Sequence, residues 1–357
     1  MRSLSTSLFA LGTLLSLGLA ACKKDDTTER PLVFTTVSTL AGAGTNGYTD
    51  GAASTAQFSA PEGLAADAQG NVYVADYGNG RIRKITPAGT VSTLAGNGNA
   101  GLTDGPGASA SFKGPADVAL DNQNNIYVAD FENNCVRKIT PAGVVSTLAG
   151  TATAGFVNGS ATAARFDRPY GLAVDAQGNV YVADYGNACI RKITPSGVVS
   201  TLAGTGALGY ADGPGSSAQF VGPKALALDA QGNLYVADFA GERIRKVTPA
   251  GVVSTLAGTG KFGYTDGPGS SAQFSGVSGL ALDAQGNLYV ADTGNNCIRK
   301  VTPGGVVSTL AGTTKAGGAD GPVATAQFNL PSDIAAGSQG VLYVTELSER
   351  IRKITTQ

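Results

Sequence analysis

Short hydrophobic runs follow one another along the chain at a constant spacing. In the third copy of the pattern they cover residues 169–175, 178–184, 189–195 and 197–204. Turn residues separate the runs, and Val180 and Val182 alternate with Tyr181 and Ala183, so both faces of this run are apolar. Such a run is typical of a strand buried between packed sheets. The pattern therefore predicts four short β-strands in each unit.

The unit occurs six times with the same length. Its central tyrosine recurs at intervals of 54 residues, at Tyr73, Tyr127, Tyr181, Tyr235, Tyr289 and Tyr343. A unit of fixed length buries its apolar faces against its neighbours, which is typical of repeat architectures. Six units of four strands predict an all-β fold, a six-bladed β-propeller.

The two ends of the repeated region complement each other. The last unit stops after its third strand, at 350–355, and a run with the pattern of a fourth strand, 36–42, precedes the first unit. We expect the N-terminal strand to complete the last blade and close the ring, because this pairing would cover an edge that is otherwise exposed.

One segment of each unit resembles a known repeat. Residues 71–84, Asn-Val-Tyr-Val-Ala-Asp-Tyr-Gly-Asn-Gly-Arg-Ile-Arg-Lys, are similar to the core of the NHL repeat, and related stretches recur in all six units. WD40 and kelch repeats fit less well because the chain has no tryptophan. The resemblance implies a propeller whose first strands line a central channel. It implies no single function, since NHL propellers include protein binders, RNA binders and a few enzymes.

The N-terminus has the pattern of an export signal. An apolar run, 8–19, is too short to span a bilayer, and two alanines and Cys22 follow it. Small residues before a cysteine resemble the signal of bacterial lipoproteins; an ordinary cleavage site is the alternative. We expect a signal peptide at 1–21, a polar tether with lipidated Cys22 at 22–32, and the propeller at 33–357. The protein would then be exported and lipid-anchored in the bacterial outer membrane, and the charged residues behind Cys22 resemble a signal for export to the cell surface.

Composition excludes several kinds of site. The chain has no histidine, which removes His-based zinc sites and His-dependent triads. With 25 basic and 26 acidic residues and no basic stripe, nucleic acid is not an expected partner.

Cys135, Cys189 and Cys297 share one position in three units, too far apart for disulfides, and are expected to be half-buried free thiols. We expect a monomer.

Most repeated polar residues are expected to build the blades. A ring of carboxylates follows the second strands, at Asp76, Asp130, Asp184, Asp238, Asp292 and Glu346. A cation-binding ring is the alternative, but most of the acids precede a turn rich in Gly and Asn and each lies near an arginine, which favours capping or ion pairing. The Gly-x-Gly-x-x-Gly loops, such as 204–213, resemble a nucleotide-binding motif, yet they recur around a β ring instead of entering a helix.

Candidate function lies where the units differ. Non-repeating side chains near the start of the first strands should meet at one mouth of the channel: Glu62, Asp117, Tyr170, Lys224 and Asp333. Their three carboxylates could hold Ca²⁺, which takes oxygen ligands. Sequence drift at solvated positions would look the same.

A weaker candidate is a set of aromatic residues in the links between blades. These residues are Tyr48, Phe156, Tyr210 and Tyr264. They either stack on sugar rings or cover their own glycine-rich loops, and the second interpretation is favoured.

These features favour a non-catalytic binding or scaffolding lipoprotein that presents its propeller to a protein or glycan ligand at the cell envelope. No nucleophile with a positioned base is evident. The alternative is a calcium-dependent enzyme, because some propellers with NHL-like blades are lactonases or lyases. Glu62 and Asp117 are candidate calcium ligands of the lactonase type, but the asparagine ligands have no evident match, and the lyase type uses histidines that this chain lacks.

Overall fold

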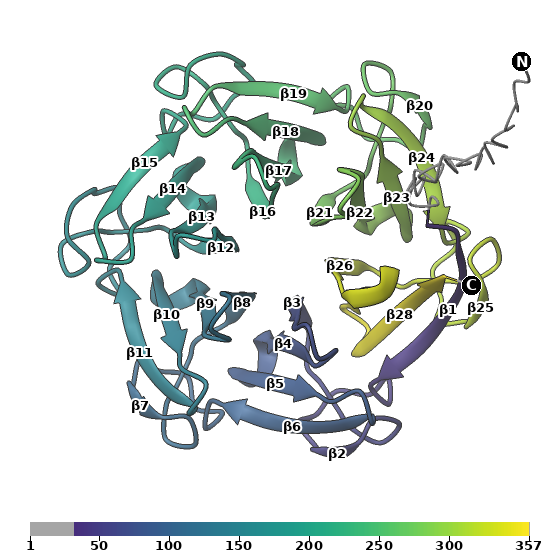
Figure 1. Ribbon diagram of the computed structural model, residues 1–357, viewed down its shortest axis with the longest axis horizontal. Helices are drawn as coiled ribbons and strands as arrows, with labels where there is room; N and C mark the ends of the chain where they lie inside the picture. Colours follow the sequence, from purple (N-terminus) through teal and green to yellow (C-terminus); the bar gives the residue numbers. More distant parts are fainter. Residues whose placement is uncertain (1–31, 357) are drawn as a thin grey trace, which may run out of the picture. The chain divides into compact units, whose positions relative to one another are not determined.

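Residues 32–356, which the computed structural model describes, form six antiparallel sheets arranged as propeller blades around a central axis (Figure 1). The first strand of each blade is innermost and the fourth lies at the outside. The predicted all-β, six-bladed propeller is confirmed. The expected lipidation site, Cys22, and the expected signal peptide lie outside the described residues.

The blades have the following strands. Blade 1 contains β3 (Pro61–Ala66), β4 (Val72–Asp76), β5 (Arg81–Ile85) and β6 (Thr90–Ala95). Blade 2 contains β8 (Pro115–Leu120), β9 (Ile126–Asp130), β10 (Cys135–Ile139) and β11 (Val144–Ala149). Blade 3 contains β12 (Pro169–Val174), β13 (Val180–Asp184), β14 (Cys189–Ile193) and β15 (Val199–Ala203).

The second half of the ring repeats this order. Blade 4 contains β16 (Pro223–Leu228), β17 (Leu234–Asp238), β18 (Arg243–Val247) and β19 (Val253–Ala257). Blade 5 contains β21 (Val277–Leu282), β22 (Leu288–Asp292), β23 (Cys297–Val301) and β24 (Val306–Ala311). Blade 6 contains β26 (Pro331–Ala336), β27 (Leu342–Glu346), β28 (Arg350–Thr356) and the N-terminal β1 (Phe34–Ala41).

The N-terminal strand closes the ring. β1 pairs antiparallel with β28, with Val37 opposite Ile354 and Ser38 opposite Lys353. In Figure 1 the purple β1 lies along the outside of the yellow last blade. The predicted completion of the sixth blade by this strand is confirmed.

Four blades carry a short fifth strand that the sequence pattern did not predict. These strands are β2 (Gly51–Ala52), β7 (Gly105–Pro106), β20 (Gly267–Pro268) and β25 (Gly321–Pro322). Each comes from the link that leads into its blade and pairs with the outermost strand there. In blades 3 and 4 a single bridge, such as that between Gly159 and Val199, takes its place. The links therefore cover part of the outer edge of every blade.

Short 3-10 turns join the second and third strands of blades 1 to 5. They are η1 (Tyr77–Asn79), η2 (Phe131–Asn133), η3 (Tyr185–Asn187), η4 (Phe239–Gly241) and η5 (Thr293–Asn295). A sixth, η6 (Ser338–Gly340), instead joins the first two strands of blade 6. The residue after each of the first five turns has left-handed backbone geometry, as at Glu242 with φ of 48°.

A buried arginine holds each blade to its link. In blade 2, Arg137 Nη1 lies 2.8 Å from Asp130 Oδ2, and Nη2 lies 2.6 Å from Asp104 Oδ1. The guanidinium also covers the ring of the fully buried Phe112. The same arrangement recurs around Arg83, Arg191, Arg245, Arg299 and Arg352, with Asn158 replacing the outer acid in blade 3. The carboxylate ring is therefore part of the scaffold, as predicted.

The three repeat cysteines are more deeply buried than expected. Cys135, Cys189 and Cys297 are free thiols, as predicted, but they are fully buried and not half-buried. The glycine that follows each fourth strand lies against the backbone and Cβ of the cysteine, as Gly150 does at Cys135, and each cysteine has no exposed surface. Burial raises the pKa of each thiol well above its usual range.

Candidate functional site

The residues that differ between blades lie at a bulge in each innermost strand. In β8 the pairing with β9 is interrupted between Pro115 and Asp117, and an equivalent interruption occurs in the other five first strands. A bulge leaves residues outside the ladder and redirects their side chains. In blades 1 and 3 pairing resumes later, at Leu64 and Leu172, so the backbone N–H groups of these leucines are free to bond elsewhere.

The bulges bring the five predicted channel residues together. Glu62, Asp117, Tyr170, Lys224 and Asp333 all line one cavity of about 10 Å³ at the narrow end of the channel. The convergence expected from the sequence is therefore present. Their role in ligand binding stays a prediction.

An ion pair spans this end of the channel. Lys224 Nζ in blade 4 lies 3.6 Å from Glu62 Oε2 in blade 1, and the two side chains are only 12% and 15% exposed. The hydroxyl of Tyr170 donates a hydrogen bond to Glu62, and Lys224 Nζ lies 4.7 Å from the centre of the Tyr170 ring. Burial, followed by the charge of Glu62, raises the pKa of Tyr170 well above its usual range. The three side chains close the narrow mouth.

Two carboxylates lie deeper in the channel. Asp117 Oδ2 accepts a hydrogen bond of 2.7 Å from Leu172 N–H, and Asp333 Oδ2 accepts one of 3.0 Å from Leu64 N–H. A Cβ at Gly63 would overlap Asp117, so the aspartate of one blade requires a glycine in the blade before it. Burial and then the charge of Asp333 raise the pKa of Asp117. Burial also raises the pKa of Asp333 to about 7, although the charge of Lys224 opposes this.

An arc of aromatic rings surrounds Tyr170. Tyr77 and Phe131 have ring centres 6.2 Å apart, Phe131 and Tyr170 are 5.4 Å apart, and Tyr170 and Tyr185 are 6.2 Å apart. All four rings, which we call the aromatic arc, are half-buried. Lys224 extends the contact to Phe239, whose ring centre is 5.1 Å from Nζ.

Apart from Tyr170, the residues of the aromatic arc were not among the site residues predicted from the sequence. Its other members follow the repeated aspartate directly, at the first residue of the 3-10 turns. Around the ring this position holds Tyr77, Phe131, Tyr185, Phe239, Thr293 and Leu347. Blades 5 and 6 have no aromatic residue at this position, whereas the other four blades do. This difference between the repeats is the sequence signal that could have identified the position.

The loop aromatics are exposed but covered on one face. Arg81 lies over Tyr48 at 4.6 Å from the ring centre, and Arg243 lies over Tyr210 at 4.2 Å. Arginines cover Phe156 and Tyr264 in the same way. Each of these rings belongs to a different link between blades, and none lines the channel cavity. These rings therefore stack on arginine side chains, and their role in ligand binding stays a prediction.

Calcium binding would need several oxygens directed at one point. Oxygens of Asp117 and Asp333 accept backbone N–H groups, and Glu62 contacts Lys224 and Tyr170. Within residues 32–356, no group of three or more His, Cys, Asp or Glu side chains is placed to share a metal ion. The site residues therefore do not form a calcium centre in this arrangement.

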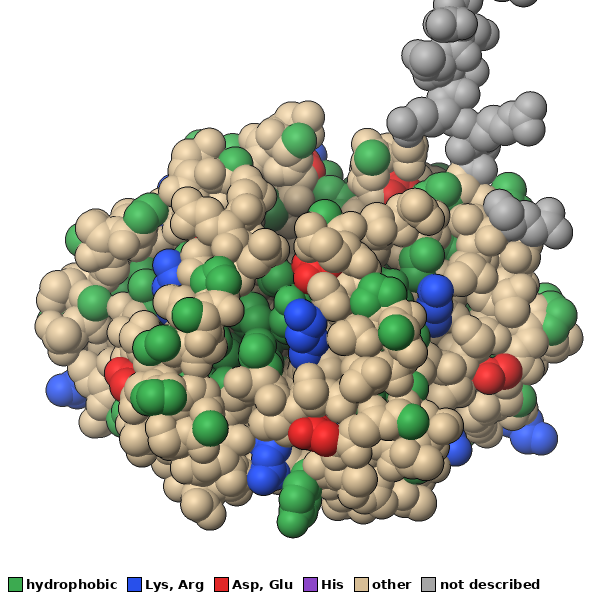
Figure 2. Space-filling model, turned by 60° about the horizontal axis from the view of Figure 1, so that its bottom comes forward, with side chains coloured by type: hydrophobic (Ala, Val, Ile, Leu, Met, Phe, Trp, Pro, Cys, Tyr) green, Lys and Arg blue, Asp and Glu red, His purple; other side chains and the backbone are tan. Residues whose placement is uncertain are grey.

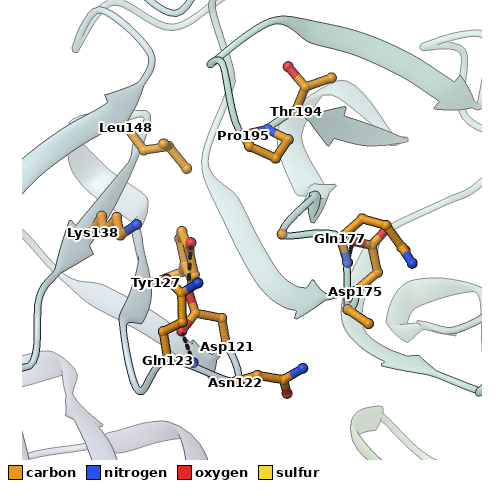
Figure 3. Close-up of a pocket in the computed structure, with 12 residues that line it drawn as sticks. Asp121, Asn122, Gln123, Tyr127, Lys138, Leu148, Asp175, Gln177, Thr194 and Pro195 are labelled. Carbon is orange, nitrogen blue, oxygen red and sulfur yellow. Dashed lines mark hydrogen bonds between the residues drawn. The ribbon is translucent and has the colours of Figure 1, made fainter.

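Grooves between blades form a further set of cavities. Figure 3 shows one of about 210 Å³, with Tyr127 and Lys138 of blade 2 on one side and Asp175 and Pro195 of the next unit on the other. The Tyr127 hydroxyl donates to Asp121, which also accepts two backbone N–H groups of its own turn. A similar groove of about 640 Å³ lies between blades 4 and 5. Because these residues repeat, the grooves are products of blade construction.

Charge does not concentrate on the surface in view. On the face drawn in Figure 2, Lys, Arg, Asp and Glu side chains are scattered singly among neutral ones. Among the described residues, no helix has the length and apolar character needed to cross a membrane.

Comparisons with known proteins agree on the repeat. The family model of the NHL repeat matches residues 58–85, 112–139, 166–193 and 274–301. The chain is 32% identical over 282 residues to the chloroplastic protein SUPPRESSOR OF QUENCHING 1 of Arabidopsis thaliana, and 31% identical over 320 residues to NHL repeat-containing protein 2 of Bos taurus. These matches cover 73% and 79% of this chain but only 27% and 44% of the relatives.

Solved structures share the fold at low identity. A protein of unknown function from Bacteroides thetaiotaomicron has a TM-score of 0.72 and 22% identity, with 90% of this chain and 76% of that chain covered. An auxiliary nutrient binding protein from Bacteroides ovatus has a TM-score of 0.69 and 18% identity, with 91% and 77% covered. A gluconolactonase from Xanthomonas campestris has a TM-score of 0.59 and 15% identity, with 90% of each chain covered. The six blades and the matched segments show that the chain is a six-bladed β-propeller that contains NHL repeats, which the family model finds in blades 1, 2, 3 and 5.

Proposed function

We propose that this protein is a non-catalytic binding or scaffolding lipoprotein of the bacterial cell envelope that takes a protein or glycan ligand at the narrow mouth of its channel. The aromatic arc carries the proposal. Its rings are half-buried around a charged pair, and binding sites commonly combine aromatic surface with a few fixed polar groups.

A glycan is the ligand class that the arc favours. Aromatic rings offer flat apolar faces to the C–H side of a sugar, and the Tyr77 hydroxyl and its acceptor Glu132 lie where sugar hydroxyls could bond. Lys113, 3.4 Å from Glu132, adds a donor at the same rim. The Bacteroides ovatus protein of similar fold is named for nutrient binding, which is consistent with this kind of role.

The enzyme alternative rests on the gluconolactonase of similar fold and on the three carboxylates of the channel. It is less well supported, because those carboxylates already bond backbone N–H groups or a lysine and are not arranged around a shared ion. Turnover of lactones that depends on added Ca²⁺ and is lost in Glu62→Ala would overturn the binding proposal.

A glycan array probed with the full chain tests the proposed ligand class. We expect a defined set of glycans to bind, and binding to weaken at least about tenfold in Phe131→Ala, since buried aromatic anchors carry much of a binding energy. If no glycan binds, and if a protein partner is captured whose binding requires Phe131, the ligand is a protein instead.

The anchor is tested separately. If residues 1–21 are a signal peptide and Cys22 is lipidated, Cys22→Ser should move the protein from the membrane fraction to the soluble fraction. Continued retention in membranes would show that the tether at 22–32 does not act through a lipid on Cys22.

A further inference from the structure

The most exposed apolar side chains belong to two neighbouring links between blades. Phe262 is 74% exposed and Leu208 is 68% exposed, and no other large hydrophobic side chain among residues 32–356 is as exposed. Leu208 lies in the link into blade 4 and Phe262 in the link into blade 5, which follow each other around the ring (Figure 1). The equivalent residues of the other four links are small or polar: Asn46, Ala100, Ala154 and Ala316. The two large apolar side chains therefore depart from the repeat and are not required to build a blade.

Both side chains stand on backbone that is held in place. Leu208 forms a β-bridge with Phe220, and Phe262 forms one with Phe274. Phe220 and Phe274 are fully buried. Each exposed side chain is therefore tied to the core of the ring, and a surface that covers it does not have to order a flexible loop first.

One arginine connects the two links. Arg243 lies over the ring of Tyr210, which comes two residues after Leu208. Its Nη2 donates a hydrogen bond of 3.1 Å to the carbonyl of Thr259, three residues before Phe262. We call the four exposed large hydrophobic residues of these two links the apolar ridge: Leu208, Tyr210, Phe262 and Tyr264.

The unpaired charge beside the ridge is positive. Lys261 is exposed next to Phe262, and Lys315 is exposed at the same position of the following link. Within residues 32–356 neither lysine is ion-paired, since the only lysine pairs there involve Lys113 and Lys224.

The acids of these links do not compensate this charge. The link into blade 4 contains one acid, Asp212, and the link into blade 5 contains one, Asp266. Both are ion-paired to buried arginines of the blades. Exposed apolar side chains beside uncompensated lysines complement a membrane with anionic lipids, because apolar groups enter the acyl boundary while lysines contact the headgroups.

We propose that the apolar ridge inserts into the interfacial region of a membrane that contains anionic phospholipid. Phe262 and Leu208 would reach the boundary between headgroups and acyl chains, and Lys261 would contact the phosphates. The two tyrosines would lie at the level of the headgroups, as aromatic residues do at membrane interfaces. A protein partner fits less well, because four partly exposed side chains offer on the order of 500 Å², whereas each side of a stable protein interface buries about 800 Å².

Contact at the ridge would leave the proposed glycan site open. Asn295 in η5 donates a hydrogen bond to the carbonyl of Gly263, so the ridge lies on the same face of the ring as the 3-10 turns. The aromatic arc, however, comes from blades 1 to 3, whereas the ridge comes from the links into blades 4 and 5. A propeller that touches a membrane at the ridge would be tilted, with the arc raised from the surface. The lipid contact depends neither on the glycan ligand nor on a lipid at Cys22.

Sedimentation with lipid vesicles tests the proposal. The parent protein is the full chain with Cys22→Ser, which removes any lipid from that residue. It is mixed with vesicles of phosphatidylcholine alone, or of phosphatidylcholine and phosphatidylglycerol in equal amounts. We expect the parent to bind the mixed vesicles at least about fivefold more tightly than the neutral ones, and added salt to weaken this binding.

Three variants of the parent locate the contact. Phe262→Asn and Lys261→Thr introduce the residue types that the first link has at positions 46 and 45. Phe262→Asn should weaken binding to the mixed vesicles about tenfold, because the ring no longer leaves water. Lys261→Thr should weaken binding to the mixed vesicles about fivefold and leave binding to the neutral ones unchanged. Val252→Thr, the control, changes an exposed valine at the opposite end of β19 from the link that carries Phe262, and should have no effect.

The outcomes separate a membrane from other occupants of the ridge. The proposal is overturned if Phe262→Asn binds mixed vesicles as tightly as the parent, if neutral vesicles bind as tightly as mixed ones, or if Val252→Thr loses as much affinity as Phe262→Asn. It is also overturned if the parent does not bind vesicles and forms a dimer in analytical ultracentrifugation that Phe262→Asn dissociates. That result would assign the ridge to a second copy of the chain.

Discussion

Lys224 Nζ lies 3.6 Å from Glu62 Oε2, and the two residues come from blades that face each other across the channel (Figure 1). In a ring of six, blades 1 and 4 are three positions apart, so the pair links opposite walls. Long side chains at two non-repeating positions therefore close one mouth of the channel and leave a cavity of about 300 Å³ among the six innermost strands.

The charge of Lys224 should be measurable at Asp333. Lys224 lowers the pKa of Asp333, which burial has raised to about 7, so Lys224→Met should raise that pKa further. Carbon-detected NMR titration of the Asp333 carboxyl would measure the change. Lys246→Met, which removes a lysine stacked on Tyr235 outside the channel, is the matched control. An unchanged Asp333 pKa in Lys224→Met would mean that the charge of Lys224 does not act on the Asp333 carboxyl.

The two acids that bind one arginine should differ in their effect on stability. Asp130 and Asp104 both contact Arg137, at 2.8 and 2.6 Å, but Asp130 is fully buried and Asp104 is 48% exposed. Asp130→Ala should lower the free energy of unfolding by about 3–5 kcal/mol, because it leaves a buried charge without its partner. Asp104→Ala should lower the free energy of unfolding by about 1 kcal/mol or less, since water and salt screen the Asp104–Arg137 pair. Urea unfolding of both variants measures the two losses in free energy of unfolding. Equal losses would show that the burial of the acid does not determine how much its ion pair contributes to stability.

Glu242 should make stability depend on pH. Both of its carboxylate oxygens accept the N–H of Gly276 in the link to blade 5, and burial raises its pKa to about 7 from the usual 4.5. A raised pKa means that its contribution is fully present below about pH 4.5 and is lost as pH rises through about 7. Glu242→Gln should therefore gain in melting temperature relative to the natural protein as pH rises from 5 to 8. Glu349→Gln, at the equivalent and less buried position of blade 6, is the control. If the difference in melting temperature between Glu242→Gln and the natural protein stays constant from pH 5 to pH 8, the pKa of Glu242 is not raised.

The buried cysteines should react only after unfolding. Burial raises the pKa of the Cys135, Cys189 and Cys297 thiols, and the thiolate is the reactive form. In a Cys22→Ser background, a thiol reagent should modify these residues at the rate of unfolding, independent of reagent concentration when reagent is abundant. Rapid modification of the native protein would show that the blades open locally at their third strands, which begin with these cysteines.

The fold was predictable from the sequence because its signals repeat. The tyrosines from Tyr73 to Tyr343 define the blades, and the run at 36–42 identifies the strand that closes the ring. The fifth strands were not predictable in this way, since two residues such as Gly51 and Ala52 have no periodicity of their own.

The candidate site was predictable in part. Disagreement among the repeats located Glu62, Tyr170 and Lys224, but not that two of them would pair across the ring, because a pair from blades 1 and 4 leaves no local pattern. Phe131 and Tyr185 were missed because they directly follow the repeated aspartate and appeared to be part of the turn. Cys135 was expected to be half-buried because its equivalents in other blades are arginines; those arginines are half-buried, but the shorter cysteine side chain is fully buried.

The most direct test of the account is a comparison of glycan affinity between Phe131→Ala and Tyr210→Ala. Both remove one aromatic ring, but Phe131 belongs to the aromatic arc at the narrow mouth and Tyr210 lies on a link beneath Arg243. If the mouth is the binding site, the first variant should lose at least about tenfold in affinity for a glycan bound by the natural protein, and the second should stay within about twofold. Loss in Tyr210→Ala with unchanged affinity in Phe131→Ala would contradict the account and place the ligand on the loop aromatics.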